Sequence, residues 1–147
     1  MKIIEVNEFT NDYLDAIQQL LQMLTSEPQQ FIEQDFRKIL ACDSSHLFFL
    51  FDDDTIAGMA TVGIYSTPTG TKAWIEDVVV DESCRGKGFG RMLTRHAIDF
   101  ARSQQADLLM LTSNPFRIAA NNLYQSMGFE QRETNVYRMK LGREGVY

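Results

Sequence analysis

Hydrophobic residues along the chain follow two spacings, one typical of strands and one typical of helices. Short runs rich in β-branched and aromatic residues predict strands at 1–6, 46–51, 56–65, 75–80 and 107–112. Apolar residues three or four positions apart predict helices over 14–24, 32–40, 89–100 and 116–127. Two more strand-like runs, 129–132 and 136–141, follow the last helix. The predicted order is strand, two helices, three strands, helix, strand, helix and two strands, a mixed α/β arrangement.

Local signals mark the ends of these elements. Asn11 is placed to cap the first helix, and Gly128 is placed to end the last one. The three aspartates at 52–54 form a charged turn, which we interpret as a solvated hairpin tip rather than a metal site. The 147 residues contain no linker, repeat or low-complexity segment. We therefore predict a single domain spanning residues 1–147.

The segment between the 75–80 strand and the helix that begins at Phe89 carries the clearest chemical signal. Together with the first turn of that helix, it holds three glycines and three basic residues: Arg85, Gly86, Lys87, Gly88, Gly90 and Arg91. Glycines let the backbone turn sharply and approach a ligand closely. The first N–H groups of a helix lack intrahelical partners and point outward at the positive end of the dipole. This loop therefore predicts an anion site for a phosphate-bearing ligand.

The spacing of the glycines narrows the choice of ligand. The Walker pattern G-x-x-x-x-G-K-[ST] is absent, and the dinucleotide pattern G-x-G-x-x-G fails because Arg91 and Leu93 stand where its third glycine is needed. What remains is R-x-x-G-x-G over residues 85–90. A second pattern, Arg117-x-x-Ala120-x-x-Leu123-Tyr124-x-x-x-Gly128-Phe129, lies in the last predicted helix.

Both patterns resemble signatures of the GCN5-related N-acetyltransferase (GNAT) family. The first resembles the loop that holds the pyrophosphate of acetyl-coenzyme A, and the second resembles the helix that carries A-x-x-[LF]-Y-x-x-x-G-F. They occur in the order, on the elements and at the separation found in that family. The resemblance covers roughly residues 45–140 well, and the first 44 residues only by pattern. It implies a mixed, mostly antiparallel sheet of six to seven strands with four helices, splayed between the fourth and fifth strands.

The resemblance also implies a function: acetyl-coenzyme A-dependent transfer of an acetyl group to a primary amine by direct attack in a ternary complex. Acetyl-coenzyme A would be the co-substrate, and no metal is expected. The residues expected to hold it lie in the loop and the helix start, namely Arg85, Gly86, Lys87, Gly88, Phe89, Gly90 and Arg91. Its pantetheine arm would pair with the splayed edge like an extra strand.

Acetyl transfer needs a base, because a primary amine is protonated at neutral pH. Glu76, beside the loop, is the candidate, acting directly or through a water. The alternative is that Glu76 only orients the substrate or pairs with a cation. Strict alternation would place Glu76 and Val78 on one face of the strand and Asp77 on the other, and we expect Asp77 to be structural.

The departing thiolate needs a proton, and the resemblance assigns its donation to Tyr124; the alternative is a tyrosine of the core. The resemblance also implies that a backbone N–H within Val78, Val79 and Val80 stabilises the oxyanion. Asn121 is placed to bind pantetheine or substrate, although a helix-surface asparagine would look the same. Arg117 stands where many relatives carry an asparagine, which makes Asn114 a further candidate for the pantetheine amides.

Composition limits the partners. A net charge of −6 and a pI near 4.8 argue against a nucleic-acid partner. No apolar run reaches membrane-spanning length and no signal peptide is evident, so we expect no membrane partner. The two cysteines, Cys42 and Cys84, fit free thiols in a cytoplasmic protein. A homodimer is compatible with the sequence.

We favour a small-molecule amine as the acceptor of the acetyl group. Glu27, Glu33 and Asp35 give the first helices an acidic bias that suits a cation, and a solvated acidic face would explain the same residues.

Two other classes of function stay open on sequence alone. The same fold could serve as a coenzyme A-binding sensor or partner-binding module without catalysis, although Glu76 and Tyr124 are both present. A nucleotide-binding module would use the same loop, but the Ser/Thr that binds Mg²⁺ is missing.

Overall fold

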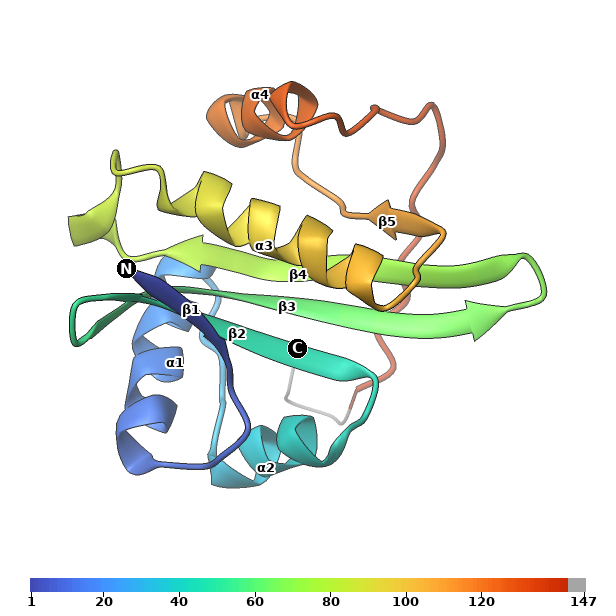
Figure 1. Cartoon of the computed structure of the whole chain (residues 1–147). Helices are drawn as coiled ribbons and strands as arrows, with labels where there is room; N and C mark the ends of the chain where they lie inside the picture. Colours follow the sequence, from blue (N-terminus) through green and yellow to red (C-terminus); the bar gives the residue numbers. More distant parts are fainter. Residues whose placement is uncertain (143–147) are drawn as a thin grey trace. The chain divides into compact units, whose positions relative to one another are not determined.

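The computed structural model describes residues 1–142, which form two compact units, one over residues 1–112 and one from residue 113 onward. The first unit is a five-stranded sheet with helices on both faces (Figure 1). Its strands are β1 (Lys2–Glu5), β2 (Ser45–Asp52), β3 (Thr55–Thr67), β4 (Gly70–Val80) and β5 (Leu108–Met110). Its helices are α1 (Asn11–Leu24), α2 (Glu33–Ala41), the short 3₁₀ helix η1 (Glu82–Cys84) and α3 (Phe89–Ser103).

The strands lie in the sheet in chain order. Strands β1 to β4 are antiparallel neighbours, and β5 runs parallel to β4 after the α3 crossover. The turn between β2 and β3 contains Asp53 in the left-handed region (φ +54°), as the predicted hairpin at 52–54 requires. This mixed, mostly antiparallel order is the predicted one.

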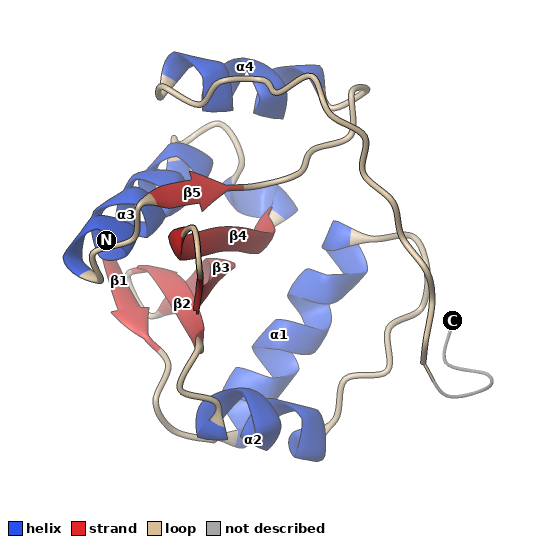
Figure 2. Cartoon of the chain, turned by 90° about the vertical axis from the view of Figure 1, so that its right-hand side faces the viewer, coloured by secondary structure: helices blue, strands red, loops and turns tan. Residues whose placement is uncertain are grey.

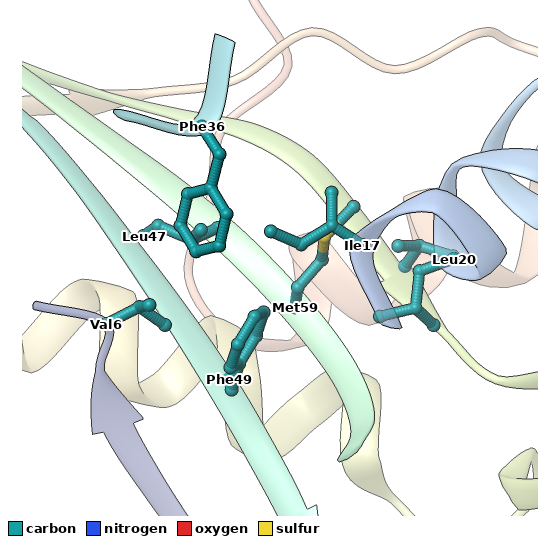
Figure 3. Close-up of a cluster of buried hydrophobic side chains, with 8 residues drawn as sticks. Val6, Ile17, Leu20, Phe36, Leu47, Phe49 and Met59 are labelled. Carbon is teal, nitrogen blue, oxygen red and sulfur yellow. The ribbon is translucent and has the colours of Figure 1, made fainter. Parts of the chain in front are cut away.

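Helices α1 and α2 cover one face of the sheet, opposite α3 (Figure 2). Eight buried side chains fill the space beneath α1 and α2, and seven of them are labelled in Figure 3: Val6, Ile17, Leu20, Phe36, Leu47, Phe49 and Met59, with Val79 from β4. Phe36 and Phe49 are completely buried. Burying aromatic and branched side chains of this size contributes roughly 1.5–3 kcal/mol each, so this cluster fixes α1 and α2 on the sheet.

Helix α3 packs on the other face through Phe89, Leu93 and Ala97, which are nearly inaccessible to solvent. Gly58 of β3 lies under this helix. A Cβ on Gly58 would approach the Val79 carbonyl oxygen to 2.9 Å and Leu93 Cδ1 to 3.1 Å, closer than packed atoms tolerate. The glycine therefore allows α3 to lie close to the sheet next to the end of β4.

Several boundaries differ from the predictions by a few residues. The N-cap of α1 is Thr10, whose Oγ1 accepts a hydrogen bond from the Tyr13 N–H at 3.0 Å, and Asn11 is the first helical residue. Strand β4 begins at Gly70 rather than at residue 75, because residues 70–74 pair with the end of β3. Strand β5 is shorter than the predicted 107–112.

The second unit contains helix α4 (Ile118–Ser126), the last predicted helix. The predicted strands at 129–132 and 136–141 are wrong, since residues 129–142 form neither helix nor strand. The sheet accordingly has five strands in the described part of the chain, not six or seven. Alternating residues favour an extended backbone, but a strand forms only where neighbouring backbone groups pair with it. No helix within residues 1–142 is long and apolar enough to cross a membrane.

Candidate active site

An irregularity in β4 positions the predicted catalytic segment. Met59 of β3 pairs with Val79 and Thr61 pairs with Glu76, so Ala60 faces two residues, Asp77 and Val78. One extra residue on one strand is a β-bulge, which bends the strand and redirects its side chains. Asp77 adopts the left-handed conformation there, with a φ of +53°, and aspartate tolerates this region better than most residues. The expected structural role of Asp77 has this backbone geometry as its basis.

The bulge changes which residues share a face. Val79 packs with Met59 beneath α1 and α2, whereas Val78 packs on the α3 face. Thr61 follows Met59 by two residues on β3, and Glu76 lies directly opposite Thr61; Glu76 therefore lies on the face that α1 and α2 cover. The expectation that Glu76 and Val78 share a face is wrong, because it assumed unbroken alternation.

Strands β4 and β5 separate close to the bulge. Their pairing extends from Lys72 opposite Leu108 to Trp74 opposite Met110, where β5 ends. Strand β4 continues to Val80, so within residues 1–112 its edge over 75–80 has no neighbouring strand on the β5 side. The predicted opening between the fourth and fifth strands is confirmed. An edge of this kind can pair with an extended ligand.

The glycine loop lies immediately after this open edge. Gly86 and Gly88 have φ values of +82° and +81°, and a Cβ on either would meet no atom within 4 Å. Gly88 is the N-cap of α3, and the first intrahelical bond runs from the Met92 N–H to the Gly88 carbonyl oxygen at 3.1 Å. The N–H groups of Phe89 and Gly90 precede that bond, and N–H groups in this position of a helix are able to bind an anion. The backbone has the open, left-handed shape that a phosphate-binding loop requires.

Buried contacts hold this loop on the sheet. Phe89 is 2% exposed and packs in one cluster with Cys84 and with Val78 and Val80 of β4. The structure thus brings together the predicted helix start and the predicted oxyanion segment. A ligand lying along the β4 edge would reach the α3 N-terminus without crossing another element of the first unit.

The basic residues of the loop have different surroundings. Lys87 Nζ lies 3.3 Å from Asp52 Oδ2 at the end of β2 and 5.9 Å from the centre of the Phe89 ring. This ion pair is solvent-exposed and holds Lys87 only weakly, as exposed pairs do. Arg85 follows η1, and Arg91 lies in the first turn of α3. All three cations are close in sequence to the start of α3, the predicted anion site.

The carboxyl group of Glu76 has a perturbed pKa. Neighbouring protein atoms partly desolvate the Glu76 carboxyl group and raise its pKa, although the residue as a whole is exposed, and the charge of the adjacent Asp77 raises the pKa further. Burial also raises the pKa of Asp77. A carboxylate with a raised pKa is a stronger base near neutral pH than an ordinary glutamate.

In the second unit the structure joins the two asparagines that were predicted to bind pantetheine. Asn121 Nδ2 donates to the Asn114 carbonyl oxygen at 3.0 Å, and Asn114 Oδ1 accepts from the Phe116 N–H at 2.9 Å. Arg117 is the N-cap of α4. The Asn114 side chain therefore closes the turn before α4, and Asn121 braces that turn with its amide nitrogen.

Tyr124 lies on α4 and is 8% exposed, with its ring 5.9 Å from the Phe129 ring in an edge-on arrangement. The helix ends in a Schellman motif: the Phe129 N–H donates to the Tyr124 carbonyl oxygen and the Gly128 N–H to that of Gln125. Gly128 has a φ of +101°, which confirms its predicted place at the helix end. Burial raises the pKa of Tyr124, and Arg117 opposes this shift, so the hydroxyl stays protonated at neutral pH.

A pocket of about 450 Å³ lies between the end of α1 and residues 25–32. Its polar lining consists mainly of Gln18, Gln22, Gln29, Gln30, Thr25 and Ser26, with Glu27 as its carboxylate. The other two acidic residues of this region have local roles. Glu33 pairs with Arg37 at 3.1 Å, and Asp35 Oδ2 accepts from the Ile32 N–H at 3.0 Å at the start of α2. Of the three predicted acidic residues, Glu27 is the one that lines this pocket.

Sequence reasoning missed two contacts beside the candidate site. Trp74 Nε1 donates to the Tyr65 hydroxyl at 3.0 Å, and Asp52 pairs with Lys87. The Pro68-Thr-Gly70 turn is the signal that could have joined 56–67 and 70–80 into one hairpin and so brought Tyr65 next to Trp74. No local signal links Asp52 to Lys87.

Comparisons with known proteins agree with this geometry. The model of the acetyltransferase (GNAT) family matches residues 14–129. Streptothricin acetyltransferase of Streptomyces lavendulae is 43% identical over 52% of this chain, and the match spans 40% of that protein. The uncharacterised N-acetyltransferase YhdJ of Bacillus subtilis (strain 168) is 33% identical over 67% of this chain and 72% of its own length. A solved structure of a candidate acetyltransferase from Agrobacterium tumefaciens str. C58 is 26% identical, with a TM-score of 0.83 over 95% of this chain and 100% of that one.

Proposed function

Because the chain belongs to the GNAT family of acetyltransferases, we propose that it transfers the acetyl group of acetyl-coenzyme A to a primary amine of a small molecule, by direct attack in a ternary complex. The observation that carries this proposal is the left-handed glycine loop at the start of α3, beside the edge of β4 that has no neighbouring strand within residues 1–112. A helix start takes a pyrophosphate, and an open strand edge takes the amides of a pantetheine arm.

Binding of the donor rests on the backbone more than on side chains. Gly86 and Gly88 leave open space where side chains would stand, and Arg85, Lys87 and Arg91 supply positive charge around the pyrophosphate. In the second unit, Asn121 and the turn built on Asn114 supply amide groups for the pantetheine. Acetyl-coenzyme A contributes the activated acetyl group, and no metal takes part in this proposal.

The amine loses a proton on the side of β4 where Glu76 lies. Glu76 accepts this proton, directly or through a water, as the nitrogen bonds to the acetyl carbon and the bond from carbon to sulfur breaks. The raised pKa of Glu76 supports this assignment. Negative charge grows on the acetyl oxygen meanwhile, and a backbone N–H of Val78, Val79 or Val80 stabilises it; one such donor contributes about 3 kcal/mol.

The sulfur leaves as a thiolate and needs a proton. Tyr124 supplies that proton from its hydroxyl, which its raised pKa keeps protonated at neutral pH. An ordered tyrosine ring with one polar end suits this role.

Calorimetric titration of the wild type with acetyl-coenzyme A, coenzyme A, ATP and NAD, compared with two variants of one residue, tests this proposal. Gly88→Asp places a carboxylate at the helix start, and Gly88→Asn places a neutral group of the same size. Both residues tolerate the left-handed backbone, so both variants should fold. We expect Gly88→Asp to weaken acetyl-coenzyme A binding at least about tenfold more than Gly88→Asn, in line with the cost of like charges in a phosphate site. Equal affinities in the two variants, or tighter binding of ATP or NAD to the wild type, would overturn the proposal.

Thiol release from acetyl-coenzyme A with a panel of amines then tests catalysis. Amine-dependent release above the uncatalysed rate supports transfer. Tight binding with no release for any amine would identify the chain as a coenzyme A-binding module instead.

A further inference from the structure

The β3–β4 hairpin carries an aromatic pair on the same face as Glu76. Three directly opposed pairs follow one another along this face: Thr61 with Glu76, Gly63 with Trp74, and Tyr65 with Lys72. Directly opposed residues of antiparallel strands point to the same side, and so do residues two apart on one strand. Trp74 is therefore the neighbour of Glu76 on this face, at a spacing of about 6.5–7 Å along the strand.

The indole of Trp74 is held by a hydrogen bond to Tyr65, and no side chain lies opposite it at Gly63. Its Nε1 donates to the Tyr65 hydroxyl at 3.0 Å, which fixes the ring orientation. Gly63, directly opposite Trp74, has no side chain, so no side chain faces the indole from across the strand pair. A Cβ on Gly63 would have the Ser44 carbonyl oxygen, at 4.0 Å, as its neighbour. The glycine thus leaves space beside the indole that a small side chain could fill.

This part of the hairpin lies beyond the paired end of β2. The pair formed by Ser45 and Gly63 begins the β2–β3 ladder, and β3 continues from there to Thr67 (Figure 1). Tyr65 is 47% exposed. The cluster under α1 and α2 takes Val79 from β4, on the other side of the bulge from Trp74. An aromatic pair that is ordered by a hydrogen bond and stands next to a candidate base is suited to bind a substrate.

We propose that Trp74, oriented by Tyr65 and opposed by Gly63, forms the wall of the acceptor site and selects amines carried on a ring. A ring offers a flat C–H or π face that stacks on an indole, and a protonated amine on that ring is drawn to the indole and to the Glu76 carboxylate. A flexible chain loses more conformational freedom for the same contact. This inference deepens the proposed function and rests on it for the role of Glu76, whereas binding at Trp74 can be measured separately.

Trp74 is the one tryptophan in the sequence, so its fluorescence reports directly on this site. Cyclohexylamine and hexylamine have six carbons and one amine each and differ in the ring. We expect cyclohexylamine to change the fluorescence of the coenzyme A-saturated protein, with a Kd about three- to tenfold below that of hexylamine, the range that an aromatic contact supplies. Glucosamine and its open-chain counterpart glucamine repeat the comparison with hydroxylated probes.

Two variants keep the fluorophore and change its surroundings. Gly63→Val fills the space opposite Trp74 with a residue that favours strands, and should remove the preference for the ring. Tyr65→Phe removes the hydroxyl that orients the indole, and should weaken the preference two- to threefold. Neither change should alter the affinity for acetyl-coenzyme A measured by calorimetry.

The inference is overturned if ring and chain amines bind equally to the wild type, or if Gly63→Val keeps the ring preference. Failure of the proposed function gives a different pattern: the ring amine still shifts the Trp74 fluorescence, but no thiol is released from acetyl-coenzyme A. If Trp74→Leu lowers kcat/KM equally for both members of each pair, Trp74 supports the strand rather than the substrate, and the proposal also fails.

Discussion

Glu76 and Val79 lie on the same face of the sheet although they are three positions apart, because the bulge opposite Ala60 inserts one extra residue between them. Val79 is thereby buried under α1 and α2, and Glu76 is exposed on the same side. Without the bulge, Glu76 and Val79 would point to opposite sides and one of the two would have to change its environment. The bulge therefore reconciles a buried core position with an accessible carboxylate on one short strand.

The accessible Glu76 carboxylate should control the acidic limb of the pH–rate profile. Since burial and Asp77 raise the pKa of Glu76, kcat/KM should rise with pH through a value above that of an ordinary glutamate. Glu76→Gln should be slow near neutral pH and recover partly at high pH, where free amine is abundant. Wild-type rates in Glu76→Gln across pH 6–9 with a saturating amine would exclude Glu76 as the base.

The same substitution has a predictable effect on stability. A carboxyl group whose folded-state pKa is raised favours folding in its protonated form, and that contribution is lost as the pH rises through the folded-state pKa. Glu76→Gln removes the titration, so its thermal midpoint at pH 7–8 should equal or slightly exceed that of the wild type. A lower midpoint would show that the Glu76 carboxylate makes a stabilising contact.

Asp77 tests the backbone of the bulge. Its φ of +53° is unfavourable for β-branched residues, so Asp77→Val should lower the free energy of unfolding by about 1–3 kcal/mol. Asp77→Asn, which tolerates the same conformation, should change it much less. Urea denaturation of the two variants measures the difference, and equal losses would place the cost in the carboxylate rather than in the backbone.

Tyr124→Phe separates chemistry from packing. The variant keeps the ring that packs against Phe129 and removes the hydroxyl, so its thermal midpoint should stay close to that of the wild type. Loss of the proton donor should lower kcat about ten- to a thousandfold. An unchanged kcat with chemistry as the slow step would assign Tyr124 to the core alone.

The two cysteines should react at very different rates. Hydrogen bonds from Ser44 and Ser45 lower the pKa of the exposed Cys42 thiol to about 7, whereas Cys84 is buried. Iodoacetamide should therefore modify Cys42 first, with half of the maximal rate near pH 7, because the thiolate is the reactive form. Ser44→Ala should move this midpoint to higher pH. Peptide mapping that found Cys84 labelled first would contradict the burial of that side chain.

How far the sequence predicts the structure depends on the range of the interactions involved. The start of α3 at Phe89 follows from the glycines before it, and its helical form follows from the spacing of its apolar residues. Both signals lie within the segment itself. Gly128 ends α4 for a similarly local reason. The bulge at Asp77 could not be predicted, because it exists only relative to Ala60 on a neighbouring strand.

Contacts between residues far apart in the sequence could not be predicted either. Lys87 and Asp52 are 35 positions apart, and each by itself looks like an ordinary surface charge. The alternating residues at 136–141 show the opposite error, in which a good local strand pattern has no strand in the structure. Two short motifs predict the roles of Tyr124 and the glycine loop, and the place of Glu76 on the strand beside that loop predicts its role. The face on which Glu76 lies depends on the register of β3 and β4.

The position of the glycine loop depends on Gly58, a residue of β3 that lies under α3. Because Gly58 has no side chain, α3 lies close to the carbonyl oxygen of Val79. The distance between the sheet and the loop that precedes α3 therefore depends on this contact. The dimensions of the proposed donor site would thus depend partly on a glycine that lies beneath α3. A methyl group added at Gly58 would push α3 away from β4. The proposed site would then change its shape although none of its own residues had been substituted.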